Sequence, residues 1–141
     1  MSVYADTSVL VSALSSEPRT ADAQAWLRAR PPGDLLTSDW TITEFSSALT
    51  LKLRIGAVSA ATRATALAAF KRLIDEAFEL VPITPGTFRA AAGFCDRHML
   101  SLRSGDALHL AAAFDRGAML CTLDKNMAAA GSALGLSTQL L

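Results

Sequence analysis

The sequence is poor in cysteine and has no excess of either charge. Its 141 residues include only two cysteines, Cys95 and Cys121, which cannot form a disulfide framework, so we expect a reduced, cytoplasmic environment. Lys and Arg together number 13, as do Asp and Glu, and the formal net charge is therefore zero. Because no global electrostatic field would recruit nucleic acid, any phosphate-binding surface must be local.

Long hydrophobic runs are also missing, although 51% of the residues are hydrophobic. No apolar run reaches the length that spans a membrane. The first ten residues, MSVYADTSVL, lack the basic segment and long apolar stretch of a secretory signal. There is no repeat or low-complexity tract, and RPPGD at 30–34 is too short to be a linker between domains. We expect one globular domain over residues 1–141, with no membrane contact.

Short segments typical of strands alternate with longer segments typical of helices. Strands are predicted at 2–5, 34–38, 79–83, 118–122 and 136–140. Helices are predicted at about 8–15, 20–30, 39–55, 59–78, 84–100, 104–116 and 124–133. Ser59 and Thr84 are suitable N-caps, and Gly117 and Gly135 are suitable helix ends. This alternation predicts a mostly parallel sheet with helices on both faces.

Four acidic residues are predicted to lie at the same edge of this sheet. Asp6 ends the first strand, and Asp124 follows the fourth. Glu44 lies about a turn and a half into the helix after the second strand. Asp106 lies in the first turn of the helix that leads back to the fourth strand. The carboxyl ends of parallel strands and the amino ends of the flanking helices share one edge, where open α/β sheets bind ligands.

Taken singly, each acid also has a structural interpretation. Asp6 and Asp124 precede helices and are candidates for N-caps. Asp106 would complement the helix dipole two residues after a Ser104 cap. Glu44 lies in an apolar stripe, either as an interhelical partner for an arginine or as a functional carboxylate. It is the convergence of all four that favours a functional site.

The segment LRSGDALHLAAAF, residues 102–114, is apolar on nearly every side and is therefore predicted to be a buried helix. It nevertheless contains Asp106 and His109, three residues apart on the same face. A buried carboxylate is costly unless something compensates it. For His109 we favour packing and a hydrogen bond over metal ligation.

A bound cation would compensate these acids. Clustered carboxylates repel one another, and some would take up protons at neutral pH unless a cation held them. Oxygen ligands without a zinc-type His or Cys pattern suit a hard ion, Mg²⁺ or Mn²⁺. Such an ion binds phosphate oxygens and activates water. Thr7, Ser8 and Thr122 flank the acids and are candidates to hydrogen-bond the carboxylates or the metal-bound water. Arg103 is a candidate to contact RNA phosphate or to pair with a nearby acid.

These motifs together resemble the PIN-domain family, in particular the VapC-like toxins of type II toxin–antitoxin systems. YADTSVLV is similar to the first acidic motif, TITEFSSAL to the second, LRSGDALHLAAA to the third and CTLDKN to the fourth. The resemblance spans almost the whole chain. It implies a three-layer α/β/α sandwich with a five-stranded parallel sheet, and a metal-dependent ribonuclease.

The resemblance also implies residue roles and partners. It makes Asp6, Glu44, Asp106 and Asp124 the catalytic acids, and Thr7, Ser8 and Thr122 supporting hydroxyls. We expect Asp6, Asp106 and Asp124 to hold the metal, and Glu44 to complete its shell or orient the water. An RNA substrate, a homodimer and a small cognate antitoxin are implied as well. Where some members carry a further acid after the fourth motif, this chain has Lys125 and Asn126, which argues against a complete second metal site.

Our hypothesis is a Mg²⁺- or Mn²⁺-dependent endoribonuclease that acts as a toxin and hydrolyses RNA phosphodiesters with a metal-activated water. One alternative is a PIN-fold binding module with little catalytic activity. Another is a phosphatase-type hydrolase that uses Asp6, although that chemistry would favour a second Asp where Ser8 stands. A partner is expected to cover apolar surface on residues 8–14 and 45–53, because excess apolar surface is typical of protein interfaces.

Overall fold

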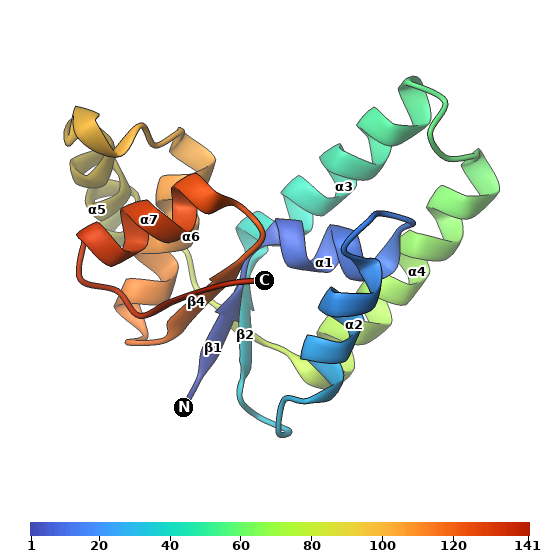
Figure 1. Cartoon of the computed structure of the whole chain (residues 1–141), viewed down its shortest axis with the longest axis horizontal. Coiled ribbons are helices and arrows are strands. Elements are labelled where there is room, and N and C mark those ends of the chain that lie inside the picture. The colour runs from blue at the N-terminus through green and yellow to red at the C-terminus, as the bar shows by residue number, and fades with distance from the viewer.

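A five-stranded parallel sheet lies at the centre of the computed structural model, which describes all 141 residues (Figure 1). The strands are β1 (Val3–Ala5), β2 (Leu35–Ser38), β3 (Glu79–Val81), β4 (Met119–Thr122) and β5 (Thr138–Leu140). They pair in the order β3-β2-β1-β4-β5, and every pair is parallel. All five predicted strands are confirmed, each one to two residues shorter than predicted.

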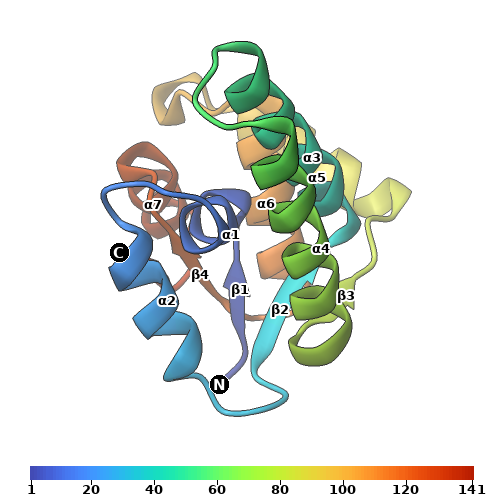
Figure 2. The ribbon, with the colours of Figure 1, turned by 90° about the vertical axis from the view of Figure 1, so that its right-hand side faces the viewer.

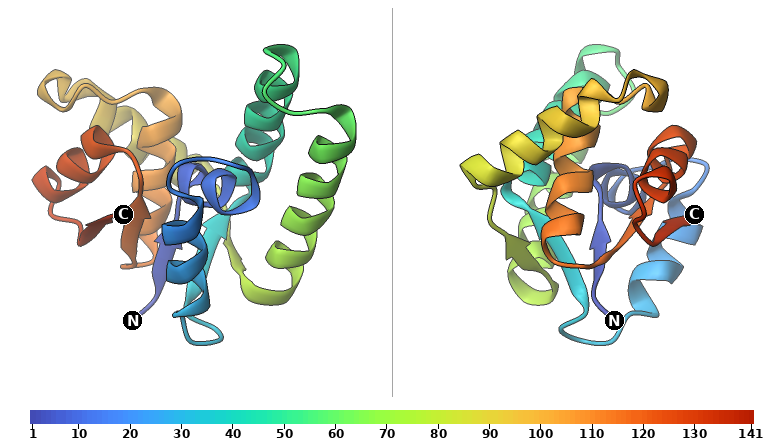
Figure 3. Two further views of the ribbon diagram at one scale, coloured as in Figure 1. Left: turned by 45° about the vertical axis from the view of Figure 1, so that its right-hand side comes forward. Right: turned by 90° about the vertical axis from the view of Figure 1, so that its left-hand side faces the viewer.

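Helices cover both faces of the sheet, as Figures 1 and 2 show. The helices are α1 (Thr7–Leu14), α2 (Thr20–Arg28), α3 (Asp39–Arg54), α4 (Ala60–Ala77), α5 (Pro85–Asp96), α6 (Ser104–Asp115) and α7 (Lys125–Ala133), with a short 3₁₀ helix η1 (His98–Leu100). Helices α1 to α4 lie on one side and α5 to α7 on the other (Figure 3). The predicted three-layer α/β/α fold is therefore confirmed. No helix is both long and apolar enough to span a bilayer.

Helix ends follow most of the predicted signals. Ser59 accepts a hydrogen bond from the Thr62 amide, and Thr84 forms a capping box with Thr87. The predicted Ser104 cap is wrong. Helix α6 begins at Ser104 itself, and the cap position falls on Arg103, whose backbone is extended and whose side chain makes no capping bond.

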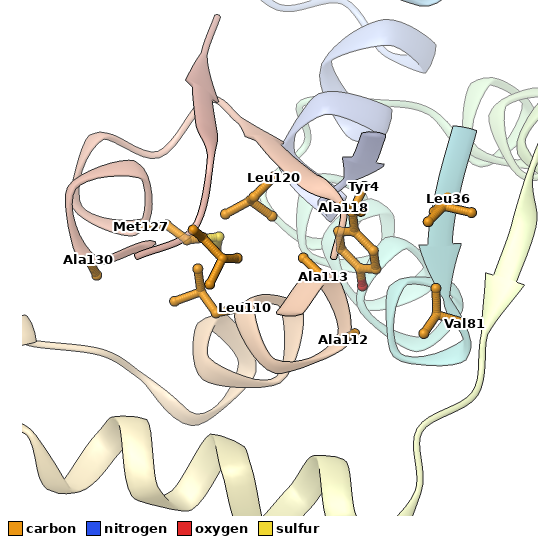
Figure 4. Packing of buried hydrophobic residues seen from close by; sticks show 11 residues of the cluster. Tyr4, Leu36, Val81, Leu110, Ala112, Ala113, Ala118, Leu120, Met127 and Ala130 are labelled. Carbon is orange, nitrogen blue, oxygen red and sulfur yellow. The ribbon is translucent and has the colours of Figure 1, made fainter. Parts of the chain in front are cut away.

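The central strand is buried on both faces, as expected for a parallel sheet covered by two helical layers. Val3 and Ala5 pack with Trp26 in the core beneath α1 and α2. Tyr4 points to the opposite face, where it packs with Leu110 and Leu120 (Figure 4). The ring of Tyr4 thus belongs to the apolar core between the sheet and α6.

Two predictions of burial need correction. The segment 107–113 is fully buried as predicted, but the Phe114 side chain is 55% exposed. Phe114 lies in the last turn of α6, where its ring makes an edge-on contact with Phe94 of α5 instead of entering the core. The predicted partner surface on residues 8–14 is also wrong for most of that segment, because Val9 to Ala13 are buried within the fold.

Candidate active site

The strand order reverses between β1 and β4, and this is the position at which open parallel sheets form ligand sites. Asp6 follows the last residue of β1, and Asp124 lies two residues beyond β4. Asp6 accepts a capping hydrogen bond from the Val9 amide at 3.3 Å, and Asp124 accepts one from the Met127 amide at 3.0 Å. Both acids are therefore helix caps, but each cap uses a single carboxylate oxygen.

Asp6 is a buried carboxylate held by hydroxyl groups. Only 2% of the residue is exposed. Ser8 Oγ donates to Asp6 Oδ1 at 2.6 Å, and Thr122 Oγ1 donates to Oδ2 at 2.7 Å. Burial raises the pKa of Asp6, and the nearby His109 and the two hydroxyl bonds offset part of that rise. Ser8 and Thr122 thus contact the carboxylate that their sequence positions led us to expect.

Glu44 reaches the same region from α3 and is half-buried. Its Oε1 accepts a hydrogen bond from Thr7 Oγ1 at 2.7 Å and is paired with Nε2 of His109 on α6. Partial burial acts to raise the pKa of Glu44, but the bonds from His109 and Thr7 lower it on balance, so the carboxylate is ionised at neutral pH. The interhelical partner of Glu44 is a histidine and not the arginine that one interpretation required.

The packing of α3 against α6 depends on Gly105. A Cβ atom at Gly105 would lie 3.0 Å from Glu44 Oε2 and 3.4 Å from the Trp40 ring. The contact with Oε2 is tight, so a side chain at this position would push the Glu44 carboxylate aside. The glycine of the segment SGDAL therefore leaves space for the Glu44 carboxylate.

Asp106 is half-buried, less than the prediction of a buried carboxylate implied, and Asp124 is exposed. The pKa of Asp106 is raised by partial burial and then by the negative charge of Asp124, with smaller contributions from Glu44 and Asp6; His109 offsets part of the rise. With Asp124 it lines a wholly polar cavity of about 370 Å³, whose other lining residues are Ser101, Arg103 and Asn126. The acids of α6 and of the β4–α7 junction thus face a common, solvent-accessible space.

This donor set fits a hard divalent cation. Neither Asp6, Asp106 nor Asp124 is paired with a basic residue in an ion pair. No three His, Cys, Asp or Glu side chains are arranged as a ready-made metal site. Mg²⁺ does not need such a cage, because it keeps several waters and is usually bound by one or two carboxylates. The unpaired carboxylate oxygens at the polar cavity match that mode, whereas the absence of converging thiolate or imidazole ligands does not match zinc.

Arg103 and Asn126 provide the polar groups at the rim. Arg103 is exposed and forms no ion pair, so the predicted alternative of pairing with a nearby acid does not occur. Asn126 donates from its side-chain amide to the carbonyl groups of Leu100 and Ser101. These bonds tie the start of α7 to the segment that precedes α6.

Sequence reasoning missed the contacts of Tyr4, Ser38 and Trp40 near the site. The Tyr4 hydroxyl lies 2.7 Å from Ser38 Oγ and 2.9 Å from His109 Nδ1. Burial raises the pKa of Tyr4 to about 12, so the phenol is neutral. The sequence placed His109 on the same helical face as Asp106, and we predicted that it forms a hydrogen bond. It did not indicate which residues would be the partners of His109.

Comparison with known proteins identifies the family and the fold. The model of the PIN domain family matches residues 3–132. Among curated proteins no sequence match is significant.

Three solved structures show the same fold. VapC20 from Mycobacterium tuberculosis, described as a Sarcin-Ricin loop cleaving toxin, is 21% identical with a TM-score of 0.74, over 92% of this chain and 95% of that one. PAE2754 from Pyrobaculum aerophilum is 23% identical with a TM-score of 0.68, over 98% and 90% of the two chains. VapBC-5 from Mycobacterium tuberculosis, a member of the VapBC family of toxin–antitoxin systems, is 21% identical with a TM-score of 0.66, over the full length of both. With the family model matching nearly the whole chain, the protein belongs to the PIN domain family.

Proposed function

We propose that this protein is a divalent-metal-dependent endoribonuclease and the toxin of a toxin–antitoxin pair. The observation that carries the proposal is the group of four acids at the β1–β4 switch point, three of which have no cationic partner. Buried or crowded carboxylates of this kind are stable at neutral pH when a cation binds them. Membership of the PIN domain family supports the same reading.

The proposed mechanism assigns a different task to each part of the site. Asp6, Asp106 and Asp124 would hold Mg²⁺ or Mn²⁺, which when bound supplies an activated water and neutralises charge on the phosphate. Glu44 Oε1 is occupied by Thr7 and His109, which leaves Oε2 to orient a water or accept its proton. Thr122 and Ser8 hold the Asp6 carboxylate in a fixed position.

RNA binding would depend on local contacts, because the chain has no net charge. Arg103 lines the acidic cavity without an acidic partner and is the candidate for a phosphate contact. VapC20, the toxin described as cleaving the Sarcin-Ricin loop, has the same fold, and this supports a structured RNA as substrate. Recognition of structured RNA through shape is compatible with a neutral protein.

A small antitoxin is the proposed partner. VapBC-5 belongs to a family of toxin–antitoxin systems and has this fold, and VapBC2 from Rickettsia felis, bound to a promoter DNA fragment, has the same fold. The homodimer that we propose also rests on the likeness to these proteins. Of the surface predicted to contact a partner, the apolar side chains of Leu51 and Leu53 on α3 are exposed and can make that contact.

The phosphatase alternative is disfavoured by the environment of Asp6. A nucleophilic carboxylate must reach its substrate, yet Asp6 is 2% exposed and both of its oxygens accept hydrogen bonds. The wholly polar cavity lies instead beside Asp106 and Asp124. Asp106 and Asp124 are thus placed to bind a cation, and Asp6 is not placed to attack a phosphorus atom.

The nuclease proposal is tested by RNA cleavage in Mg²⁺ or Mn²⁺ and in EDTA. Structured RNA, including a sarcin–ricin-type hairpin, should be cut by the wild-type protein and not by Asp6→Asn, because an amide keeps the shape of the side chain but removes its charge. Asp96→Asn, at an exposed position on α5, is the matched control and should cleave normally. Cleavage that persists in EDTA, or in well-folded Asp6→Asn protein, would refute the metal assignment.

The toxin proposal is tested separately by expression without a partner. Wild-type protein should arrest bacterial growth, and Asp106→Asn should relieve the arrest at equal soluble expression. If the wild-type chain is harmless while purified protein cleaves RNA, the toxin proposal fails and the nuclease proposal survives.

A further inference from the structure

A buried row of polar side chains runs from the sheet to Glu44. Ser38 Oγ at the end of β2 lies 2.7 Å from the Tyr4 hydroxyl on β1, which lies 2.9 Å from Nδ1 of His109. Nε2 of His109 pairs with Glu44 Oε1. Ser38 and Tyr4 are 0% exposed and His109 is 2% exposed, so water does not complete any of these contacts. Four separate elements, β2, β1, α6 and α3, each contribute one member.

The direction of these hydrogen bonds follows from counting donors and acceptors. Nε2 of His109 faces Glu44 Oε1, and a carboxylate oxygen can only accept, so a neutral His109 carries its single proton on Nε2. Tyr4 is the only hydrogen-bond partner of Ser38 Oγ. If Tyr4 donated to Ser38, the Ser38 proton would be left buried without an acceptor, which costs about 1–3 kcal/mol. Every proton is satisfied when Ser38 donates to Tyr4, Tyr4 donates to His109 Nδ1, and His109 Nε2 donates to Glu44.

The apolar core fixes the middle of this row. Figure 4 shows the Tyr4 ring among Leu36, Val81 and Ala112, with its hydroxyl oxygen at the far end of the ring. The Tyr4 and His109 rings meet edge-on, with their centres 5.7 Å apart. Because the phenol cannot swing away without disturbing the core, its hydroxyl constrains both the tautomer and the ring orientation of His109.

We propose that Ser38, Tyr4 and His109 form a one-directional hydrogen-bond chain that positions Glu44 for the reaction. His109 is then a positioning residue, and Tyr4 and Ser38 act on Glu44 through it. The inference rests on the proposed function, since it names the residues that keep Oε1 of Glu44 occupied and Oε2 directed toward substrate or water. Gly105 contributes by leaving the space next to Oε2 free of a Cβ atom.

The direction of the chain is tested by NMR of the imidazole nitrogens, which does not depend on activity. The protein has only two histidines, and His98 is exposed, so a His98→Asn variant assigns the spectrum. We expect His109 to carry its proton on Nε2 at neutral pH. Its Nδ1 should be unprotonated and should accept a hydrogen bond. Tyr4→Phe should shift the Nδ1 resonance, because it removes the donor to that atom. A protonated Nδ1 in the wild-type protein, or an unchanged Nδ1 in Tyr4→Phe, would overturn the proposal.

The positioning role is tested by kinetics on an RNA that the wild-type protein cleaves. Tyr4→Phe should lower kcat about 10-fold and leave KM unchanged, as is typical when an outer partner of a functional group is removed. In a His109→Gln background, whose amide still donates to Glu44, the additional Tyr4→Phe change should have no further effect. Additive losses in the double variant, or a loss confined to KM, would overturn the proposal.

Two further variants separate positioning from folding. Ser12→Ala removes a buried hydroxyl that has no hydrogen-bond partner and lies outside the chain, and it should leave kcat unchanged. Ser38→Ala replaces Tyr4→Phe in the kinetic experiment if the latter does not fold, and it should also lower kcat; the protonation of Nδ1 in the wild-type spectrum then decides the direction of the chain. If the wild-type protein cleaves no RNA, the proposed function fails together with the role of Glu44, whereas the NMR result still decides the direction of the chain.

Discussion

Asp6 and Asp124 each cap a helix and also belong to the group of four acids at the edge of the sheet. The capping bonds come from the amides of Val9 and Met127. At Asp124 the structural and functional interpretations of the sequence are therefore compatible, because a carboxylate has two oxygens and the cap uses one. A substitution can separate the two contributions, provided that it keeps the cap and removes the charge.

Asp124 is the better position for this separation, since it lines the polar cavity. Asp124→Ser should abolish RNA cleavage with little change in stability, because serine is about as good an N-cap as aspartate. Asp124→Ala should abolish cleavage and also lower the free energy of unfolding by about 1 kcal/mol, because the Met127 amide loses its acceptor. Urea denaturation and an RNA cleavage assay on both proteins check this prediction. Cleavage by Asp124→Ser would show that the carboxylate is only a cap.

Residue-level contacts could be predicted from the sequence where they are local. Ser8 lies two residues from Asp6 and bonds to it, as the flanking position suggested. The pairing of Glu44 with His109 could not be predicted, because it joins residues 65 apart in the chain and depends on how α3 packs against α6. The Ser104 cap failed for a different reason: a good capping residue was available, but α6 begins one residue earlier than its position required.

At the scale of elements, Gly131 of α7 makes the closest approach in the helical layers. A Cβ atom there would lie 2.6 Å from Thr138 Cγ2 on β5 and 3.0 Å from Leu110 Cδ2 on α6. Thr138 cannot easily rotate away, because its hydroxyl bonds to Ser132 Oγ and to the Ala128 carbonyl. The absence of a side chain thus sets the distance of α7 from the sheet.

Gly131→Ala should therefore lower the free energy of unfolding by about 1–3 kcal/mol, the usual cost of overpacking. Gly93→Ala is the matched control, because Gly93 lies within α5 and an added Cβ would contact nothing within 4 Å. It should instead stabilise the protein by about 0.4–1 kcal/mol. Denaturant melts of both variants measure the difference. If both substitutions stabilise the protein equally, the helix–strand packing at Gly131 does not constrain α7.

The type and order of the elements were predictable from the sequence, because turn and cap residues separate periodic segments. Thr84 and Pro85 fix the start of α5, and Gly117 has the positive φ of 59° that ends α6. The end of α5 was not predictable. Helix α5 ends at Asp96, and after Arg97 the chain continues as η1, although the composition of residues 97–100 is compatible with a longer helix.

At the scale of the whole molecule, the sheet order concentrates negative charge in a protein that has no net charge. The pKa of Asp6 and that of Asp106 are both raised, so each carboxylate binds its proton more tightly in the folded than in the unfolded state. A raised carboxylate pKa means that stability decreases as pH rises from the unfolded value through the folded one. Without a cation, ionisation of these two acids therefore opposes folding at neutral pH.

Thermal melts with EDTA and with Mn²⁺ test this balance. In EDTA, Asp106→Asn should be at least as stable as the wild-type protein, because it removes one mutually repelling charge and no hydrogen bond. Mn²⁺ at about a hundred times its dissociation constant should stabilise the wild-type protein by about 2.7 kcal/mol, a rise in Tm of roughly 5–15 °C for a chain of this size. The rise in Tm with Mn²⁺ should be much smaller for Asp106→Asn. For the exposed control Asp96→Asn it should equal that of the wild-type protein. Equal rises in all three proteins would place the ion elsewhere, and a destabilised Asp106→Asn in EDTA would show that the carboxylate supports the fold rather than a cation.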